Sequence, residues 1–217
     1  MRSDLIYNEE LLEGRNAIVT GGATGLGRAI AVGLAQVGAT VTIVSRQEAI
    51  LKEAAKQISD ETGKMISYDI VDIRDVESVD QLSGRHKNVD ILINNAGGQF
   101  PQKARDFTSN GWRSVIDLNL NGTWNMTQAF GNNMLEREGG SICQIIATVG
   151  RGIPGIAHSA SARAGVLELS RTLAFEWGPK VRVNCVAPGQ FRTEAFDSTY
   201  EDGVGDGFVD QPLPNIG

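Results

Sequence analysis

The run from Thr20 to Gly27, TGGATGLG, constrains the fold more than any other stretch of the chain. It joins the apolar segment 17–19 to a helical pattern that is established by Arg28. A strand that enters a glycine turn and continues into a helix leaves backbone N–H groups and the positive end of the helix dipole facing an anion. The glycines of this turn leave room for a pyrophosphate. The run therefore predicts a dinucleotide site, although its Gly-x-x-x-Gly-x-Gly spacing differs from the commoner Gly-x-Gly-x-x-Gly.

Length and composition limit the chain to one domain over residues 1–217. A chain of 217 residues that is 41% hydrophobic and contains 26 glycines fits a single α/β domain with a substantial core. The net charge of −6 is spread along the chain, so neither nucleic acid nor an anionic membrane surface is an expected partner. No stretch is long enough to span a bilayer, and the first ten residues lack an apolar signal core, which predicts a cytoplasmic protein. Cys143 and Cys185 lie in apolar runs and are expected to be buried free thiols.

Strand-like and helix-like segments alternate along the chain. Short β-branched runs predict strands at 17–20, 40–44, 64–68, 89–93, 141–146 and 181–186. Apolar periodicity predicts helices at 26–37, 47–59, 75–82, 112–136 and 159–177. This order predicts a parallel sheet with helices on both faces and ligands at the carboxyl ends of the strands. The stretch 196–217 is rich in Gly, Asp and Pro and predicts a loop.

Three further motifs follow the glycine run. Asn94-Asn95-Ala96-Gly97 comes after the fourth predicted strand, DLNLNG (117–122) lies in the long helix, and VNCVAPG (183–189) ends the sixth strand. In this order and spacing the four motifs resemble the short-chain dehydrogenase/reductase family over nearly the whole chain. The resemblance implies a Rossmann-type doubly wound parallel sheet that binds a nicotinamide dinucleotide. It also implies the cofactor contacts: a pyrophosphate turn at Gly21, Thr24, Gly25, Leu26 and Gly27, adenine contacts at Asp69 and Ile70, ribose contacts at Asn95, Ala96 and Gly97, and nicotinamide contacts at Pro188, Gly189 and Thr193.

The end of the chain differs from the family pattern. The resemblance implies a further helix and a seventh strand after residues 212–217, so we expect a C-terminally truncated member. The strand at 181–186 would then lie at an open, apolar edge of the sheet. Family members are homo-oligomers, and this chain is expected to keep at most a dimer contact through the helices at 112–136 and 159–177.

The active-site signature also departs from the family. Most members place a serine after the fifth strand and a Tyr-x-x-x-Lys pair on the following helix. This chain has Ile146, Ser159 and Arg163 at those three positions, and only Asn119 of the usual tetrad remains. The run HSASARAG (158–165), with the stretch NAGGQF (95–100), resembles the enoyl- and dienoyl-CoA reductase branch, especially the peroxisomal trans-2-enoyl-CoA reductases.

The chemistry of these residues agrees with that branch. Hydride delivery to a ketone creates an alkoxide that needs an acid such as tyrosine, and serine is too weak an acid for this role. Hydride delivery to an enoyl thioester creates an enolate, whose oxygen can be held by donors such as Asn119, Thr148 and Ser159. Arg163 lies one turn from Ser159 and could reach the ribose hydroxyls while its charge favours the enolate. Two alternatives stay open: a carbonyl reductase with relocated donors, and a non-catalytic dinucleotide-binding protein.

The end of the second predicted strand bears on the coenzyme. An acidic residue there would accept the ribose hydroxyls of NAD and repel a 2′-phosphate, but this chain has Ser45 followed by Arg46. The pair predicts NADP(H) in preference to NAD(H). The alternative interpretation makes Ser45 a helix cap and Arg46 a solvated residue. His86 and His158 have no second ligand near them in sequence, so no metal site is predicted.

Overall fold

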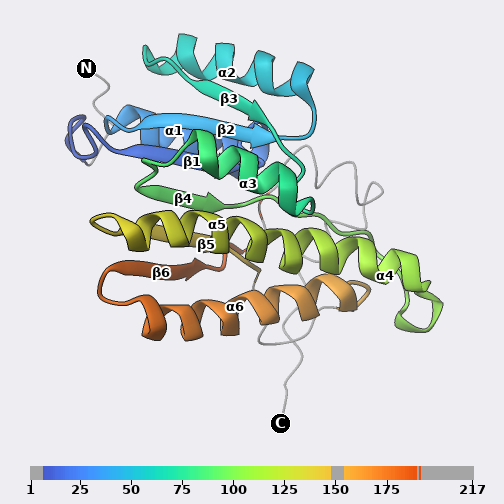
Figure 1. Cartoon of the computed structure of the whole chain (residues 1–217). Coiled ribbons are helices and arrows are strands. Elements are labelled where there is room, and N and C mark those ends of the chain that lie inside the picture. The colour runs from blue at the N-terminus through green and yellow to red at the C-terminus, as the bar shows by residue number, and fades with distance from the viewer. Residues whose placement is uncertain (1–6, 148–153, 190, 192–217) are drawn as a thin grey trace.

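The computed structural model describes residues 7–147, 154–189 and 191. Six strands form one sheet in which every neighbouring pair is parallel, in the order β3-β2-β1-β4-β5-β6 (Figure 1). The strands are β1 (Asn16–Thr20), β2 (Thr40–Ser45), β3 (Ser67–Ile70), β4 (Ile91–Asn94), β5 (Gly140–Ile145) and β6 (Val181–Val186). The α-helices are α1 (Gly25–Gln36), α2 (Glu48–Thr62), α3 (Val76–Arg85), α4 (Ser109–Ile116), α5 (Gly122–Glu136) and α6 (Ala157–Trp177). A 3₁₀ turn, η1 (Ala104–Asp106), precedes α4, and a π-helical segment, η2 (Asp117–Asn121), joins α4 to α5.

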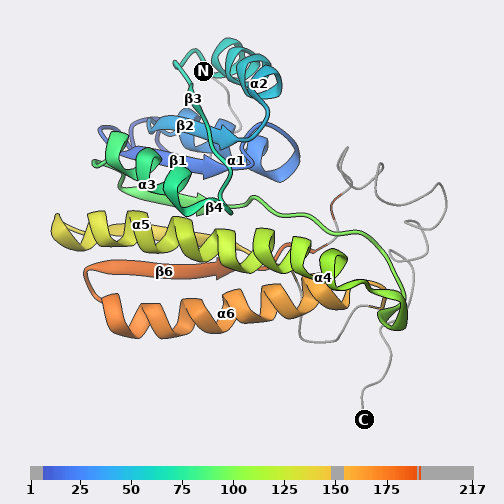
Figure 2. The same cartoon turned by 45° about the vertical axis from the view of Figure 1, so that its right-hand side comes forward.

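Helices cover both faces of the sheet, as the alternation of segments predicts. The helices α3, α5 and α6 lie across one face, and α1 and α2 pack on the other (Figures 1 and 2). Successive residues of β1 enter opposite cores, because Ala17 and Val19 pack with α1 and α2 whereas Ile18 packs with α3 and α5. A central strand buried on both faces reads as a continuous apolar run, which is why the sequence signal for β1 is strong.

The strand order reverses between β1 and β4, and this reversal positions the site. The connection from β1 leads outward to β2 on one side, while β4 lies on the other side of β1. The loops after the two strands therefore separate at the carboxyl edge and leave a crevice, which is where open α/β sheets bind ligands. Side-chain bonds tie the two loops together: Asn95 N donates to Thr20 Oγ1 (2.9 Å) and Asn95 Nδ2 donates to Thr20 O (3.1 Å).

Several predicted boundaries differ from the structure. The strand predicted at 64–68 lies at 67–70, because α2 continues to Thr62 and ends at Gly63, whose φ of 70° reverses the chain. The helix predicted at 112–136 begins at Ser109 and contains the π-helical segment. Cys143 and Cys185 are free, as expected, but half-buried rather than buried, since β6 is an edge strand among the described residues.

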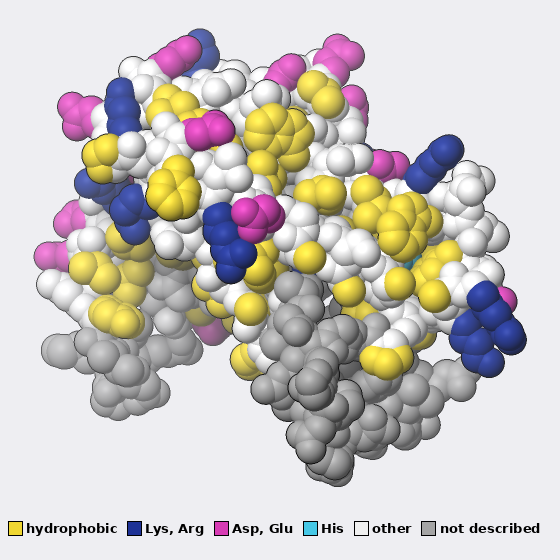
Figure 3. All heavy atoms as spheres, turned by 90° about the horizontal axis from the view of Figure 1, so that it is seen from below, with side chains coloured by type: hydrophobic (Ala, Val, Ile, Leu, Met, Phe, Trp, Pro, Cys, Tyr) yellow, Lys and Arg dark blue, Asp and Glu magenta, His cyan; other side chains and the backbone are white. Residues whose placement is uncertain are grey.

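The side of the molecule that carries α6 shows apolar side chains at the surface. Seen from below, hydrophobic side chains form several patches between charged ones (Figure 3). Phe175 on α6 is 91% exposed and Val186 at the end of β6 is 48% exposed. Among the described strands β6 lies at an edge of the sheet as expected, but its exposed residues include Arg182 and Asn184 while Val181 and Val183 are buried, so this edge is more polar than predicted. No helix among the described residues is long and apolar enough to cross a membrane.

Candidate active site

The glycine turn after β1 presents the N-terminus of α1 to the crevice. Gly21 adopts a φ of 61° and its N–H donates to Val44 O (2.8 Å), which holds the turn against β2. An added Cβ at Gly27 would overlap Gly21 O and Asn95 Nδ2, so this glycine lets α1 pack closely on the turn. Thr24 is the N-cap of α1 but its side chain makes no capping hydrogen bond. The first N–H groups of α1 therefore suit an anion such as a pyrophosphate.

A cavity of about 280 Å³ lies beside this turn, at the carboxyl ends of β1, β2 and β4. It brings together six of the residues predicted to bind the cofactor: Gly21, Thr24, Ser45, Arg46, Ala96 and Gly97. Its other lining residues are Ala23, Val44, Gln47, Ile50, Val71, Asp72, Ile73 and Leu118. Residues from five separate segments thus converge on one space, which fits the adenosine and pyrophosphate parts of a dinucleotide.

Asp69 and Ile70 do not reach this cavity, which corrects their expected role at the adenine. Both lie within β3, where the Asp69 carboxylate pairs with Arg85 (3.0 Å) and His86 (2.5 Å) and Ile70 is exposed. The residues that follow β3 and line the cavity are Val71, Asp72 and Ile73. The physical reason is the later start of β3, which moves its carboxyl end from residue 68 to residue 70.

Arg46 lines the cavity near Asp72. Asp72 is already paired with Arg74, and the hydrogen bond from this guanidinium lowers the pKa of the Asp72 carboxyl, as does the positive charge of Arg46 to a smaller extent. Arg46 is exposed and has neither an ion pair nor a hydrogen bond within the described parts of the chain. Ser45 Oγ accepts the Gln47 N–H (3.4 Å), but the N-cap of α2 is Gln47 itself, so Ser45 is not the helix cap of the alternative interpretation. The cation remains available to an anionic ligand.

Asn119 ties the loop after β4 to α6. It lies fully buried in η2, where its Oδ1 accepts Gly98 N–H (2.9 Å) and its Nδ2 donates to Gly98 O (2.9 Å). The same Nδ2 lies 3.3 Å from Ser159 Oγ on α6. A π-helical segment inside a helix frequently marks a functional site, because it releases backbone groups and redirects side chains. Two of the predicted donors, Asn119 and Ser159, are therefore in contact.

Arg163 places a buried cation next to these donors. Its Nη1 donates to Ile145 O (2.7 Å), and its guanidinium lies directly against Gly97. Burial lowers the pKa of Arg163 to about 10, so the side chain stays charged at neutral pH. Among the described residues no carboxylate pairs with it. A largely desolvated cation without a carboxylate partner is costly, which suits a position that faces a ligand.

An arginine at this position needs the glycine beside it. A Cβ at residue 97 would overlap a terminal nitrogen of Arg163 and crowd Asn119 Oδ1. We expect Gly97→Ala to destabilise the protein by about 1–3 kcal/mol, the usual cost of overpacking. In an Arg163→Lys background, which lacks the overlapping nitrogen, the cost of Gly97→Ala should be smaller by roughly 1 kcal/mol. Urea unfolding of the four proteins measures this coupling, and equal costs in both backgrounds would contradict it.

His158 is a residue that the sequence reasoning set aside. It is completely buried against Phe100 and Phe107, and its Nδ1 accepts the Ser159 N–H (2.8 Å). Burial lowers the pKa of His158, so the ring is neutral at neutral pH. Its place directly before Ser159 is a signal that could have marked it. Within the described residues no cluster of His, Cys, Asp and Glu could hold a metal ion.

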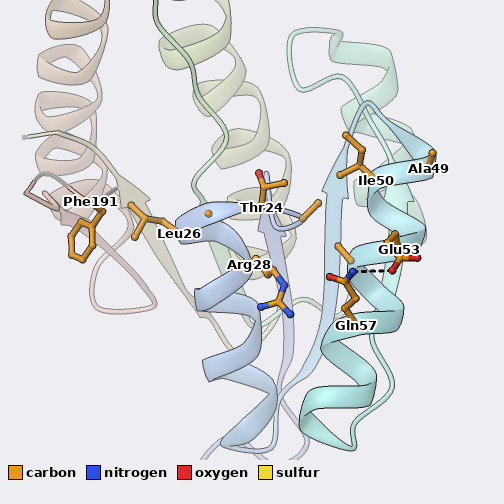
Figure 4. A pocket seen from close by; sticks show the side chains of 11 residues that line it. Thr24, Leu26, Arg28, Ala49, Ile50, Glu53, Gln57 and Phe191 are labelled. Carbon is orange, nitrogen blue, oxygen red and sulfur yellow. Dashed lines mark hydrogen bonds between the residues drawn. The ribbon is translucent and has the colours of Figure 1, made fainter. Parts of the chain in front are cut away.

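Other predicted residues lie at the margins. Gly25, Leu26 and Gly27 form the first turn of α1, while Pro188 and Gly189 follow the carboxyl end of β6. Thr148 and Thr193 lie outside the described residues. A larger groove of about 910 Å³ runs between α1 and α2 from Thr24 (Figure 4). Leu26 and Phe191 lie on its α1 side, while Ile50 and the Glu53–Gln57 pair lie on its α2 side. Neither Asn119 nor Ser159 lines this groove.

Comparison with known proteins places this site in a family. The sequence profile described as "short chain dehydrogenase" matches residues 15–203. The chain belongs to the short-chain dehydrogenase/reductase family. This membership makes it an oxidoreductase of a family that binds NAD or NADP, and it confirms the fold class and the family predicted from the four motifs.

Three similar proteins show the range within this family. The chain is 38% identical over 199 residues to a probable 2,4-dienoyl-CoA reductase of Bacillus subtilis (strain 168), covering 88% of this chain and 78% of the relative. It is 35% identical over 213 residues to the 3-oxoacyl-[acyl-carrier-protein] reductase FabG of Chlamydia muridarum, covering 95% and 86%. A candidate NAD(P)-dependent gluconate 5-dehydrogenase of Beutenbergia cavernae, solved with NADP, matches with a TM-score of 0.86 at 32% identity, covering 93% and 82%.

Proposed function

We propose that this short-chain dehydrogenase/reductase is an NADPH-dependent reductase of the conjugated double bond of an enoyl-CoA or a related acyl thioester. The observation that carries the proposal is the contact between Ser159 and Asn119 beside the buried Arg163. These groups are hydrogen-bond donors and a fixed cation, and none of them is an acid strong enough to protonate an alkoxide. The similarity to a 2,4-dienoyl-CoA reductase supports the same chemistry.

In this proposal each residue has a defined task. The bound nicotinamide supplies a hydride to the far carbon of the conjugated system, and the electron pair of the double bond moves toward the thioester carbonyl. Ser159 Oγ donates a hydrogen bond to the enolate oxygen, Asn119 Nδ2 donates to Ser159 Oγ and so orients this hydroxyl, and the positive charge of Arg163 stabilises the developing negative charge. A guanidinium does not lose its proton in proteins, so Arg163 does not deliver the proton that the α-carbon then takes up.

The coenzyme is proposed to be NADPH. The cavity beside the glycine turn offers the open N-terminus of α1 to the pyrophosphate and Arg46 to a 2′-phosphate. Asp72 carries a negative charge at the same mouth, but Arg74 already compensates it. A homo-oligomer, which is usual in the family, stays a prediction.

The second candidate is reduction of a 3-oxoacyl thioester with relocated donors, which the 35% identity to FabG favours. Single-turnover oxidation of NADPH with crotonyl-CoA, hexa-2,4-dienoyl-CoA and acetoacetyl-CoA separates the candidates. We expect oxidation with the first or second compound and not with the third. Oxidation with acetoacetyl-CoA alone would favour the carbonyl reductase. NADPH binding without oxidation by any compound would favour a non-catalytic dinucleotide-binding protein.

A further inference from the structure

An aromatic cluster surrounds His158, the residue directly before Ser159. His158 lies perpendicular to Phe100 with ring centroids 4.7 Å apart, and Phe107 lies 4.4 Å from the same imidazole. Phe107 also contacts Trp112 (6.3 Å). The cluster joins two segments that are distant in sequence: the stretch from the loop after β4 to the first turn of α4, and the first turn of α6.

The imidazole also binds the backbone of its neighbour. Ser159 lies in the first turn of α6, where N–H groups have no acceptor within the helix. His158 Nδ1 accepts this N–H at 2.8 Å. An accepting Nδ1 carries no proton, so the neutral ring holds its proton on Nε2. Burial has the larger effect and favours the neutral ring, because it lowers the pKa of His158, while a hydrogen bond to the Ile156 backbone acts in the opposite direction.

The second ring nitrogen, Nε2, indicates that aromatic packing alone does not explain why a histidine occupies position 158. Nε2 is buried and has no hydrogen-bond partner among the described residues. A buried donor without an acceptor is unfavourable, so phenylalanine would fill an aromatic cluster at lower cost. The perpendicular Phe100 ring offers at best the weak acceptor of a π face. The benefit of an imidazole here therefore lies in the bond from Ser159 N–H to Nδ1.

We propose that His158 is a positioning residue for Ser159. Its Nδ1 fixes the backbone of residue 159 while Asn119 Nδ2 holds the hydroxyl, so that Ser159 Oγ is oriented before substrate binds. The same ring docks Phe100 and Phe107, and with them the loop after β4, onto the start of α6. The Nδ1 atom accepts the backbone N–H, whereas the ring as a whole packs against the two phenylalanines. Substitutions can therefore remove one of these roles and keep the other. The kinetic part of this proposal rests on the proposed function.

Two variants separate the two roles. His158→Phe keeps an aromatic ring but loses the acceptor, and His158→Asn keeps an acceptor oxygen near the Nδ1 position but loses the ring. We expect His158→Phe to lower kcat about tenfold or more with little change in the KM for the thioester. His158→Asn should keep kcat within about threefold and raise that KM. An unchanged kcat in His158→Phe, or equal losses of kcat in both variants, would overturn the proposal.

A measurement without substrate distinguishes failure of this inference from failure of the proposed function. Solvent exchange of the Ser159 amide, followed by NMR, should be at least about tenfold faster in His158→Phe than in the parent and unchanged in His158→Asn. The Ala160 amide, which donates to Ile156 O (2.9 Å), is the control within the same turn. In the parent, long-range proton–nitrogen correlations should show the proton on Nε2. The inference is overturned if the proton lies on Nδ1, or if the exchange rate of the Ser159 amide is the same in His158→Phe as in the parent. Either result counts even if the enzyme reduces enoyl thioesters.

Discussion

Ser159→Ala should lower turnover of an enoyl thioester roughly ten- to thousandfold, the range typical of removing one oxyanion donor. The hydroxyl is buried beside Asn119, so a water molecule does not readily take the place of the lost hydrogen-bond donor. NADPH binding should change little, because Ser159 does not line the coenzyme cavity. Single-turnover oxidation of bound NADPH measures the effect directly.

The matched control is Ser161→Ala, which removes an exposed serine from the same helix and should leave the rate unchanged. Unchanged turnover in Ser159→Ala would remove this residue from the mechanism. The double variant Ser159→Tyr with Arg163→Lys should not simply restore ketone reduction. The motif spacing predicts Ile146 at the position where most family members have a serine, and on this prediction the new tyrosine would lack its hydrogen-bonding partner.

The sequence predicts the fold well because its strongest signals are also the most local ones. A strand buried on both faces, such as β1, reads as an unbroken apolar run, and the glycines of the following turn are required by its geometry. The edge strand β3 is half-exposed and lacks such a run. Its predicted position is therefore early by two to three residues, and this shift alone misplaces the adenine contacts.

The repeated pair in Asp69-Ile70-Val71-Asp72-Ile73 makes that error instructive. This stretch contains two Asp-Ile pairs, and the position where β3 ends decides which of them reaches the cavity. Local sequence cannot fix this end, because it depends on pairing with β2, where Ser45 lies opposite Ile70. Contacts between distant segments are likewise invisible in sequence. The packing of His158 against Phe100 and Phe107 could not be predicted for this reason, since these two residues lie more than fifty positions before it in the chain.

The coenzyme preference can be tested without any substrate. Arg46 should make a charge-assisted contact with the 2′-phosphate that is worth about 1.5–3 kcal/mol, so Arg46→Ala should weaken NADPH binding roughly ten- to hundredfold. NADH lacks this phosphate, and its affinity should hardly change. Lys52→Ala, which removes an exposed cation of α2 that does not line the cavity, controls for the loss of one positive charge.

Ser45→Asp should act in the opposite sense on the two coenzymes. The new carboxylate would accept the ribose hydroxyls of NADH and repel the 2′-phosphate of NADPH, so the preference should move toward NADH. The hydroxyl of Ser45 makes only a long bond to Gln47 N (3.4 Å), so little local structure is lost in the exchange. Fluorescence titration of the parent and the three variants with both coenzymes decides the matter. Equal affinity of the parent for NADPH and NADH would refute the role given to Arg46, because a cation that recognises the 2′-phosphate must discriminate between them.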